Sequence, residues 1–305
     1  MAQPVPSNAR RSCQGKARRP DAHKGIDEGQ SLKIPTITKQ EPLLVEAGVS
    51  KLTKVQFARQ PRSALLKEPV RFWDEIYIAN EAYVLDEVTH PRIRRKLAYD
   101  AETHRLFLEY VEGVTLNDLV KAGTTVQDPG RTHQILQCVA ETVADMHGGI
   151  FCDRPIVHND LKSMNVLVPA AAPRETVLID FSHSYFEGRL PPFIADNQHN
   201  PAGTAKYMAP EKWAGSHEHG RPGDVFAFGV MAYYAYTGRF PFDGDAAQIE
   251  QQIREAPPAT PIQLGVNVLR NMQAIVMSCL EKQPNRRPSM EQVARCYAET
   301  ASLFK

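Results

Sequence analysis

The sequence has no long hydrophobic run, which argues against a membrane-spanning helix. Its longest apolar stretch, Phe226 to Tyr236, is far shorter than the roughly 20 residues that cross a bilayer. The N-terminal region also lacks the apolar core of a secretory signal peptide. The formal net charge of +1 at pH 7 gives the whole molecule no general attraction for nucleic acid. We therefore expect no membrane span and no nucleic-acid partner.

Cysteine is scarce, and its pattern excludes two common kinds of stabilised fold. The 5 cysteines are scattered, odd in number and include no CxxC pair, so neither a disulfide framework nor a cysteine zinc site is expected. The histidines do not match a compact zinc spacing either, as shown by His183, His199, His217 and His219. These absences favour reduced thiols and an intracellular location, cytoplasmic or nuclear.

The first forty residues differ in composition from the rest of the chain. Basic residues between Arg10 and Lys24 lie among Pro, Ser, Gln and Gly, with few large apolar residues. Such a segment cannot bury enough surface to offset the entropy lost on ordering, so residues 1–40 are predicted to form a disordered basic tail. A nuclear-import signal, contact with an anionic surface and a plain solvated tail are all compatible with the basic cluster.

The most informative stretch reads HNDLKSMN, from His158 to Asn165. It places a carboxylate, a lysine and an asparagine at the spacing used to move a phosphoryl group from ATP to a hydroxyl. Asp160 would accept the proton of the attacking hydroxyl, and Lys162 would neutralise charge on the transferring phosphate. These two residues and Asn165 are the predicted catalytic residues.

A second carboxylate follows in the sequence Asp180-Phe181-Ser182. Asp180 and Asn165 would hold the divalent cations, Mg²⁺ or Mn²⁺, that bridge the phosphates of ATP. The alternative is that both stretches are solvated polar loops that match by accident. Further matches downstream, in the right order, argue against this alternative.

The stretch resembles the catalytic loop of eukaryotic-type protein kinases, whose usual form is H-R-D-L-K-x-x-N, with Asn159 in place of the arginine. Residues 203–211, GTAKYMAPE, are similar to the end of the kinase activation segment. Residues 224–230, DVFAFGV, resemble the buried helix that organises the larger kinase lobe. The resemblance runs from about Pro42 to the end of the chain.

Two further expectations come from this resemblance. The sequence PNRRPS at residues 284–289 matches the family's last landmark, which implies an ion pair between Arg287 and Glu211. In most kinases the arginine before the catalytic aspartate binds a phosphate on the activation segment. Asn159 cannot supply that charge, so we expect activity that does not depend on phosphorylation of residues 182–206.

The resemblance implies an α+β fold with two lobes and with ATP between them. The small β-rich N-lobe is expected at about residues 41–112, and the larger α-helical C-lobe at about residues 113–305. The sequence pattern predicts particular elements, namely strands at 43–45, 55–58 and 177–179, helices at 73–88 and 131–147, and mostly helices after Pro241.

The family's glycine-rich loop, G-x-G-x-x-G-x-V, has its spacing here but not its glycines, since the matching residues are Gly48, Ser50, Thr53 and Val55. Glycine matters there because backbone amides must approach the phosphates without side chains in the way. Gly48 and Val55 are the expected nucleotide contacts of this loop, with Val55 above the adenine ring. Leu65 replaces the small residue usual over the adenine.

Lys67 ends the sequence SALLK, which aligns with the family's V-A-I-K strand. The resemblance implies that Lys67 binds the α- and β-phosphates and pairs with Glu81 on the following helix. The alternative is that both are ordinary surface charges. The sheet-facing residues of that helix are expected at helical spacing, namely Ile76, Tyr77, Asn80, Glu81, Val84 and Leu85.

Residues 105–113 resemble the strand that leads into the hinge between the lobes. By resemblance, the Glu109 carbonyl and the Val111 amide would bond the edge of the adenine, and Leu108 would be the gatekeeper. Leu167 would close the adenine pocket from below. A plain core strand would carry the same apolar residues, so these roles come from the resemblance alone.

Two details indicate the substrate class. Lys162 after the catalytic aspartate and Thr204 before A-P-E match the serine/threonine type, which implies a protein substrate with a Ser or Thr hydroxyl. A pseudokinase that binds ATP or acts as a scaffold is the alternative, favoured by the altered glycine loop, Leu65 and Ser182. A small-molecule phosphotransferase is a third option, but it would not be expected to carry A-P-E. The oligomeric state stays open.

Overall fold

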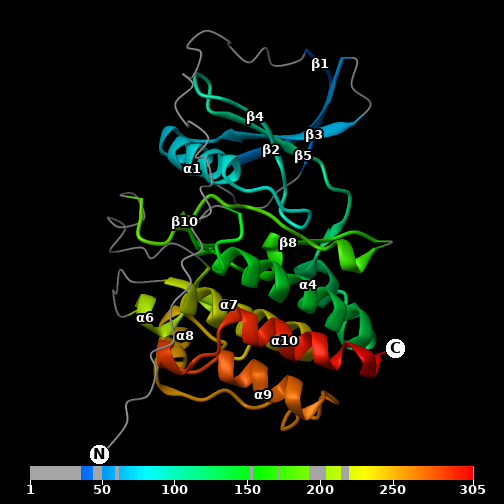
Figure 1. Ribbon diagram of the computed structural model, residues 1–305, viewed down its shortest axis with the longest axis vertical. Coiled ribbons are helices and arrows are strands. Elements are labelled where there is room, and N and C mark those ends of the chain that lie inside the picture. The colour runs from blue at the N-terminus through cyan, green and yellow to red at the C-terminus, as the bar shows by residue number, and fades with distance from the viewer. Residues whose placement is uncertain are drawn as a thin grey trace, which may run out of the picture. The chain divides into compact units, whose positions relative to one another are not determined.

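The computed structural model describes residues 36–43, 50–58, 62–151, 154–170, 172–191, 204–213 and 220–304. Within these ranges the expected two-lobed α+β architecture is confirmed (Figure 1). None of their helices has the length and hydropathy of a membrane span. Most of the predicted tail and Gly48 lie outside the described residues.

The N-lobe contains a five-stranded antiparallel sheet in the order β1-β2-β3-β5-β4. Because side chains alternate along each strand, the sheet has two different faces. On one face a small apolar cluster forms around Val55, Ala64 and Phe107. The opposite face carries Lys67 and packs toward the main core. The strands are β1 (Ile37–Pro42), β2 (Ser50–Phe57), β3 (Ser63–Pro69), β4 (Lys96–Asp100) and β5 (Arg105–Glu109).

The first strand differs from its prediction. The sequence predicted a tail up to residue 40, whereas β1 spans Ile37–Pro42. The strand expected at 43–45 lies mostly outside the described residues, which end at 43 and resume at 50. The side chains of β1 are almost all exposed, so the strand has no apolar pattern that sequence inspection can detect. Pairing of its backbone with β2 stabilises it instead.

Helix α1 (Glu75–Asp86) follows a short 3₁₀ turn, η1 (Phe72–Asp74), and matches the expected helix at 73–88. Its predicted buried face is partly wrong, because Ile76 is 45% exposed while Ile78 is fully buried. Apolar residues occur around most of the circumference of α1, so periodicity does not define one face. Burial is decided by the two surfaces that α1 touches, the sheet and the segment after Asp180.

The C-lobe is built on two helices that pack against each other, α4 (Pro129–His147) and α7 (Gly220–Thr237). Helix α4 also packs against α10, and α7 packs against α9. Asp128 caps α4 by accepting from the Arg131 N–H, and Pro129 favours its first turn. The expected helix at 131–147 is thus confirmed. The other helices are α2 (Leu116–Lys121), α3 (Thr124–Gln127), α6 (Pro210–Trp213), α8 (Ala246–Glu255), α9 (Arg270–Cys279) and α10 (Met290–Thr300).

Short strands join the two lobes and carry the loops of interest. Strand β8 (Val166–Val168) pairs with β6 (Val114–Thr115) and with β9 (Val177–Leu178), and β9 confirms the strand expected at 177–179. Strand β7 (Ile156–Val157) pairs with β10 (Tyr185–Phe186). Strands β7 and β8 flank the stretch that begins at His158, and strands β9 and β10 flank the stretch that begins at Asp180. Because β7 pairs with β10 and β8 with β9, the two stretches lie side by side.

Arg287 forms the expected ion pair with Glu211. Both carboxylate oxygens accept from the guanidinium, each at 2.8 Å. The remaining N–H groups of Arg287 donate to the carbonyls of Glu281, Lys282 and Pro222. The Arg287 side chain is fully enclosed, so all its donors have partners in a region without water.

Gly229 is required by the packing of α7. A Cβ atom there would lie 2.7 Å from the Cβ of Cys279 and 3.1 Å from Leu280. We expect Gly229→Ala to lower the free energy of unfolding by about 1–3 kcal/mol, because overpacking must displace α9. Urea denaturation measures this. Gly223→Ala is the matched control in the same helix, since nothing lies within 4 Å of its Cβ. It should be neutral or stabilising by up to about 1 kcal/mol. Equal effects of both substitutions would contradict the packing argument.

Candidate active site

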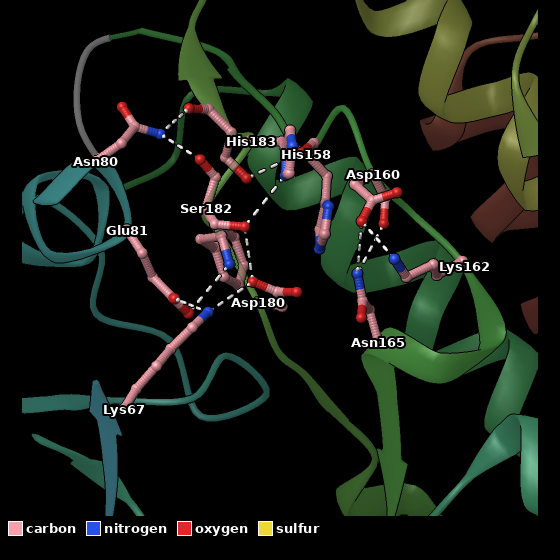
Figure 2. Close-up of polar contacts among 12 residues, drawn as sticks. Lys67, Asn80, Glu81, His158, Asp160, Lys162, Asn165, Asp180, Ser182 and His183 are labelled. Carbon is pink, nitrogen blue, oxygen red and sulfur yellow. Dashed lines mark hydrogen bonds and ion pairs between the residues drawn. The ribbon is translucent and has the colours of Figure 1, made fainter. Parts of the chain in front are cut away.

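Lys67, Glu81 and Asp180 form one charge cluster (Figure 2), in which Lys67 and Glu81 are buried and Asp180 is partly exposed. The Lys67 Nζ lies 2.6 Å from Glu81 Oε2 and 3.0 Å from Asp180 Oδ1. Burial by itself would lower the pKa of Lys67, but the charges of Asp180 and Glu81 outweigh it and raise the pKa above its ordinary value. Burial would raise the pKa of Asp180, but Lys67 outweighs it and holds that pKa well below its usual range. Lys67 and Asp180 are therefore charged at neutral pH.

The catalytic-loop residues lie together beside this cluster (Figure 2). The Lys162 Nζ donates to Asp160 Oδ2 at 2.6 Å, and the Thr204 N–H donates to Asp160 Oδ1 at 3.3 Å. The Asn165 Nδ2 donates to the Asp160 carbonyl at 2.8 Å. Since its amide nitrogen is used in this way, Asn165 keeps its Oδ1 as an acceptor. Asp160 is only 7% exposed.

Asp224, at the start of the buried part of α7, binds the backbone of the catalytic loop. Its carboxylate accepts from the backbone N–H groups of His158 and Asn159, at 2.8 and 2.9 Å, and pairs with His147 at 3.0 Å. The sequence identified this helix but not the role of Asp224. The sequence did contain one sign of this role, because Asp224 is a charged residue directly before an apolar run.

His158 is fully buried, and its ring packs on Phe181 with ring centroids 4.9 Å apart. Neither ring nitrogen has a hydrogen-bond partner among the described residues. This placement beneath the segment that carries Asp180 agrees with a packing role.

Asn159 links two parts of the site. Its backbone has a φ of 64°, a conformation that asparagine tolerates better than most residues. Its Nδ2 donates to the His183 carbonyl at 3.1 Å, and its Oδ1 accepts from Lys212 Nζ at 2.5 Å. Lys212 is buried, and burial lowers its pKa. The position of the missing arginine thus holds a neutral residue that joins Lys212 to the segment after Asp180.

The segment after Asp180 is also held by α1 (Figure 2). The buried Asn80 donates from Nδ2 to the carbonyls of Ser182 and Ser184, at 3.0 and 2.9 Å. The neighbouring Glu81 accepts from the Phe181 N–H at 3.2 Å. Motif spacing gave no sign of the Asn80 contacts, because they join residues about a hundred positions apart.

Ser182, in place of the family's glycine, contacts Asp180 directly. Its Oγ donates to Asp180 Oδ1 at 2.8 Å, the same oxygen that accepts from Lys67. Among the described contacts, Asp180 Oδ2 is left as the oxygen available to a cation. Ser184 is fully buried and donates from Oγ to the His158 carbonyl at 3.0 Å.

The expected position of Val55 above the adenine is wrong. Val55 pairs with Ala64, whereas Lys67 pairs with Leu52 on β2. Alternation therefore places Val55 on the sheet face opposite Lys67, where it is fully buried with Phe57 and Phe107. Leu52, Leu65, Leu106 and Leu108 share the face of Lys67.

Glu109, Val111 and Leu167 stay predicted nucleotide contacts. Glu109 ends β5, and the half-buried Val111 lies in the connection to β6. Leu167, 8% exposed, alternates with the core residues Val166 and Val168 and therefore faces away from the main core. Gly48 lies outside the described residues.

The donor set of the site suits a hard cation. Asp180 and Asn165 offer oxygen atoms, which Mg²⁺ prefers, and Mg²⁺ usually binds through one or two carboxylates together with phosphates. The described residues contain no cluster of three or more His, Cys, Asp and Glu side chains that could enclose a metal alone. The arrangement therefore fits a cation that binds jointly with a nucleotide.

Known proteins resemble this chain along most of its length. Residues 62–296 match the model of the protein kinase domain. Serine/threonine-protein kinase pkn2 of Myxococcus xanthus is 32% identical over 219 residues, which are 68% of this chain and 25% of that protein. Pkn3 of the same organism is 27% identical over 82% of this chain and 47% of its own length. Human mitogen-activated protein kinase kinase kinase 7 is 28% identical over 72% of this chain and 35% of its own.

The chain thus spans between a quarter and about half of the length of these relatives. The family model covers strands β3, β4 and β5 of the sheet, the catalytic loop, the segment after Asp180 and the helices that support them. On this match, the chain belongs to the protein kinase family.

Proposed function

We propose that this chain is a protein serine/threonine kinase that transfers the γ-phosphoryl group of ATP to a Ser or Thr hydroxyl of a protein. Family membership implies ATP and a divalent cation, and we propose Mg²⁺ or Mn²⁺ as the cation. The assembled Lys67–Glu81–Asp180 cluster carries the proposal, with Lys67 at 2.6 and 3.0 Å from the two carboxylates. A protein kinase needs these groups in contact to bind nucleotide phosphates and metal.

Each residue then has a proposed part in the reaction. Lys67, oriented by Glu81, would bind the α- and β-phosphates. Asp180 and Asn165 would hold the cations through Oδ2 and Oδ1. Bound ATP supplies the γ-phosphoryl group, and the cations neutralise its charge during transfer. The backbone of Glu109 and Val111 would bind the adenine edge, with Leu167 below it.

Asp160 is the proposed proton acceptor. Its carboxylate is held by Lys162 and by the Thr204 N–H, which supports a fixed orientation toward the substrate hydroxyl. Lys162 would neutralise charge near the transferring phosphate. Thr204 lies beside this carboxylate, which is consistent with the serine/threonine class. We further propose an intracellular site of action, cytoplasmic or nuclear.

The test is transfer of radiolabelled γ-phosphate from ATP, with Mg²⁺ or Mn²⁺, to basic peptides that differ only in a central Ser, Thr or Tyr. Label in the Ser and Thr peptides, absent with Asp180→Asn, would support the proposal. Label in the Tyr peptide alone would contradict the substrate class. Nucleotide binding without any transfer would indicate the pseudokinase alternative.

Asn80 is expected to affect the reaction by positioning Asp180. Asn80→Ala removes both donors to the segment after Asp180, so we expect kcat to fall about 10- to 100-fold, the usual effect of losing a supporting contact at a metal site. The Mg²⁺ concentration for half-maximal rate should rise. Asn271→Ala is the control, because Asn271 is exposed in the first turn of α9 and its Oδ1 accepts only from the neighbouring Met272 N–H among the described contacts. A lower melting temperature with an unchanged Mg²⁺ dependence would contradict the positioning role.

Activity should not require phosphate on the segment after Asp180. Asn159 is neutral and already joins Lys212 to the His183 carbonyl, so this link to His183 does not depend on an added phosphate. We expect phosphatase-treated protein to keep its initial rate to within about twofold, checked by intact-mass measurement before the assay. A large drop, restored by ATP preincubation, would contradict this.

A further inference from the structure

Arg94 is a buried cation with no ion-pair partner in the part of the chain that the structure describes. It is 8% exposed and lies between the turn after His90 and strand β4. Its Nε is enclosed without a hydrogen-bond partner among the described residues. The other arginines of this region do have partners, since Arg92 pairs with Glu141 and Arg95 with Glu109. Buried charges are normally paired, so this exception needs an explanation.

The backbone places Arg94 between the two parts of the proposed nucleotide site. The Arg94 N–H donates to the Leu178 carbonyl at 3.0 Å, two residues before Asp180. The carbonyl of the next residue, Arg95, accepts from the Glu109 N–H of the hinge at 2.9 Å. The Arg95 side chain is exposed, whereas that of Arg94 turns inward.

The charges that act on Arg94 belong to that site. Burial lowers the pKa of Arg94 to about 10, and the negative charges of Glu81, Asp180 and Glu109 oppose this effect. Glu81 and Asp180 are bonded to Lys67, and no ion pair joins either of them to Arg94 among the described residues. A guanidinium has donors only. The site therefore holds a protonated group that has no acceptor from the described residues.

We propose that Arg94 is a nucleotide-binding residue whose guanidinium donates hydrogen bonds to an acceptor of the bound nucleotide. The acceptor is a purine ring atom or a phosphate oxygen, both of which arginine binds readily. The proposal rests on the proposed function, because it assumes that a nucleotide occupies this site. It explains why a charge is kept buried without a partner: the ligand provides the partner.

The experiment is calorimetric titration of ADP with Mg²⁺ into the wild-type chain and Arg94→Met. Methionine keeps a long unbranched side chain and removes the charge. We expect ADP affinity to fall about 10- to 100-fold, as for loss of a charged hydrogen bond. The melting temperature of the nucleotide-free protein should stay the same or rise, because an unpaired buried charge is removed. Arg105→Met is the control, since Arg105 is half exposed and pairs with Glu68.

Adenosine, AMP and ADP, each titrated separately, distinguish the two acceptors. Equal losses of affinity for all three would assign the acceptor to the base or ribose. A loss for AMP and ADP but not for adenosine would assign it to a phosphate. Either pattern supports a nucleotide contact by Arg94.

Equal ADP affinity in the wild type and Arg94→Met would overturn the proposal. A fall in melting temperature, or failure of Arg94→Met to fold, would also overturn it, because Arg94 would then stabilise the chain itself. Absence of ADP binding to the wild-type chain is a different result. It would contradict the proposed function, and this proposal with it.

Discussion

Asp160→Asn is expected to lower kcat about 10²- to 10⁴-fold, the usual contribution of a positioned general base. Asparagine has the same shape and can still accept from the Thr204 N–H, which bonds Asp160 Oδ1 at 3.3 Å. It cannot accept a proton, and it leaves Lys162 without the charged partner that lies 2.6 Å away. Substrate binding should change little, so the loss should appear in kcat with the KM for ATP almost unchanged.

Steady-state kinetics with saturating peptide measures this loss, and ADP affinity is determined in parallel. Asp100→Asn is the control, because Asp100 accepts hydrogen bonds only within its own exposed turn, and the asparagine oxygen can still accept from the Glu102 N–H. It should leave kcat unchanged. Turnover by Asp160→Asn within tenfold of the wild type would contradict the general-base assignment.

Arg287→Met is expected to lower the free energy of unfolding by about 3–5 kcal/mol, the usual cost of removing one partner of a buried ion pair. The guanidinium satisfies the Glu211 carboxylate and three backbone carbonyls at once. Methionine would leave all of these acceptors buried without donors. Phe226, whose ring lies 5.0 Å from the Arg287 guanidinium, would also lose that contact.

Chemical denaturation gives the change in free energy, provided that the transition is two-state. Arg295→Met is the matched control, since Arg295 pairs with Glu291 on the exposed face of α10. Exposed pairs contribute about 0–1 kcal/mol, so this substitution should have little effect. A similar small effect for Arg287→Met would contradict the importance of the buried pair.

Short motifs carried most of what could be predicted. The residues between His158 and Asn165 are close in sequence, so their spacing fixes which groups meet. The long-range Lys67–Glu81 and Glu211–Arg287 pairs came from the family resemblance, and both are present. Compact loops and landmark sequences therefore allowed the charged groups to be identified before the fold was known.

The sheet face of Val55 was predicted wrongly because the register of β2 against β3 cannot be read from the sequence. Without its glycines, the loop before β2 provides no fixed point from which to count. An error of one residue in a strand moves a side chain to the other face. Only the pairing of β2 with β3, Leu52 with Lys67 and Val55 with Ala64, determines which side chains face the nucleotide site.

Distant contacts that no family motif indicates could not be predicted from the sequence. Asn80, Asp224 and Arg94 have functions that depend on which backbone groups or charges lie opposite them. Each is a polar residue in an otherwise apolar environment, and such residues occur for many reasons. Their partners become apparent only after the lobes have folded around them.

The Asn159–Lys212 contact has a consequence for how these two positions can vary. Arginine at 159, the residue usual in the family, would bring a second positive charge against a buried lysine whose pKa burial already lowers. The arginine would also replace the Asn159 amide that donates to the His183 carbonyl. Positions 159 and 212 are therefore constrained as a pair. Asn159→Arg should be tolerated only together with a neutral or acidic residue at position 212.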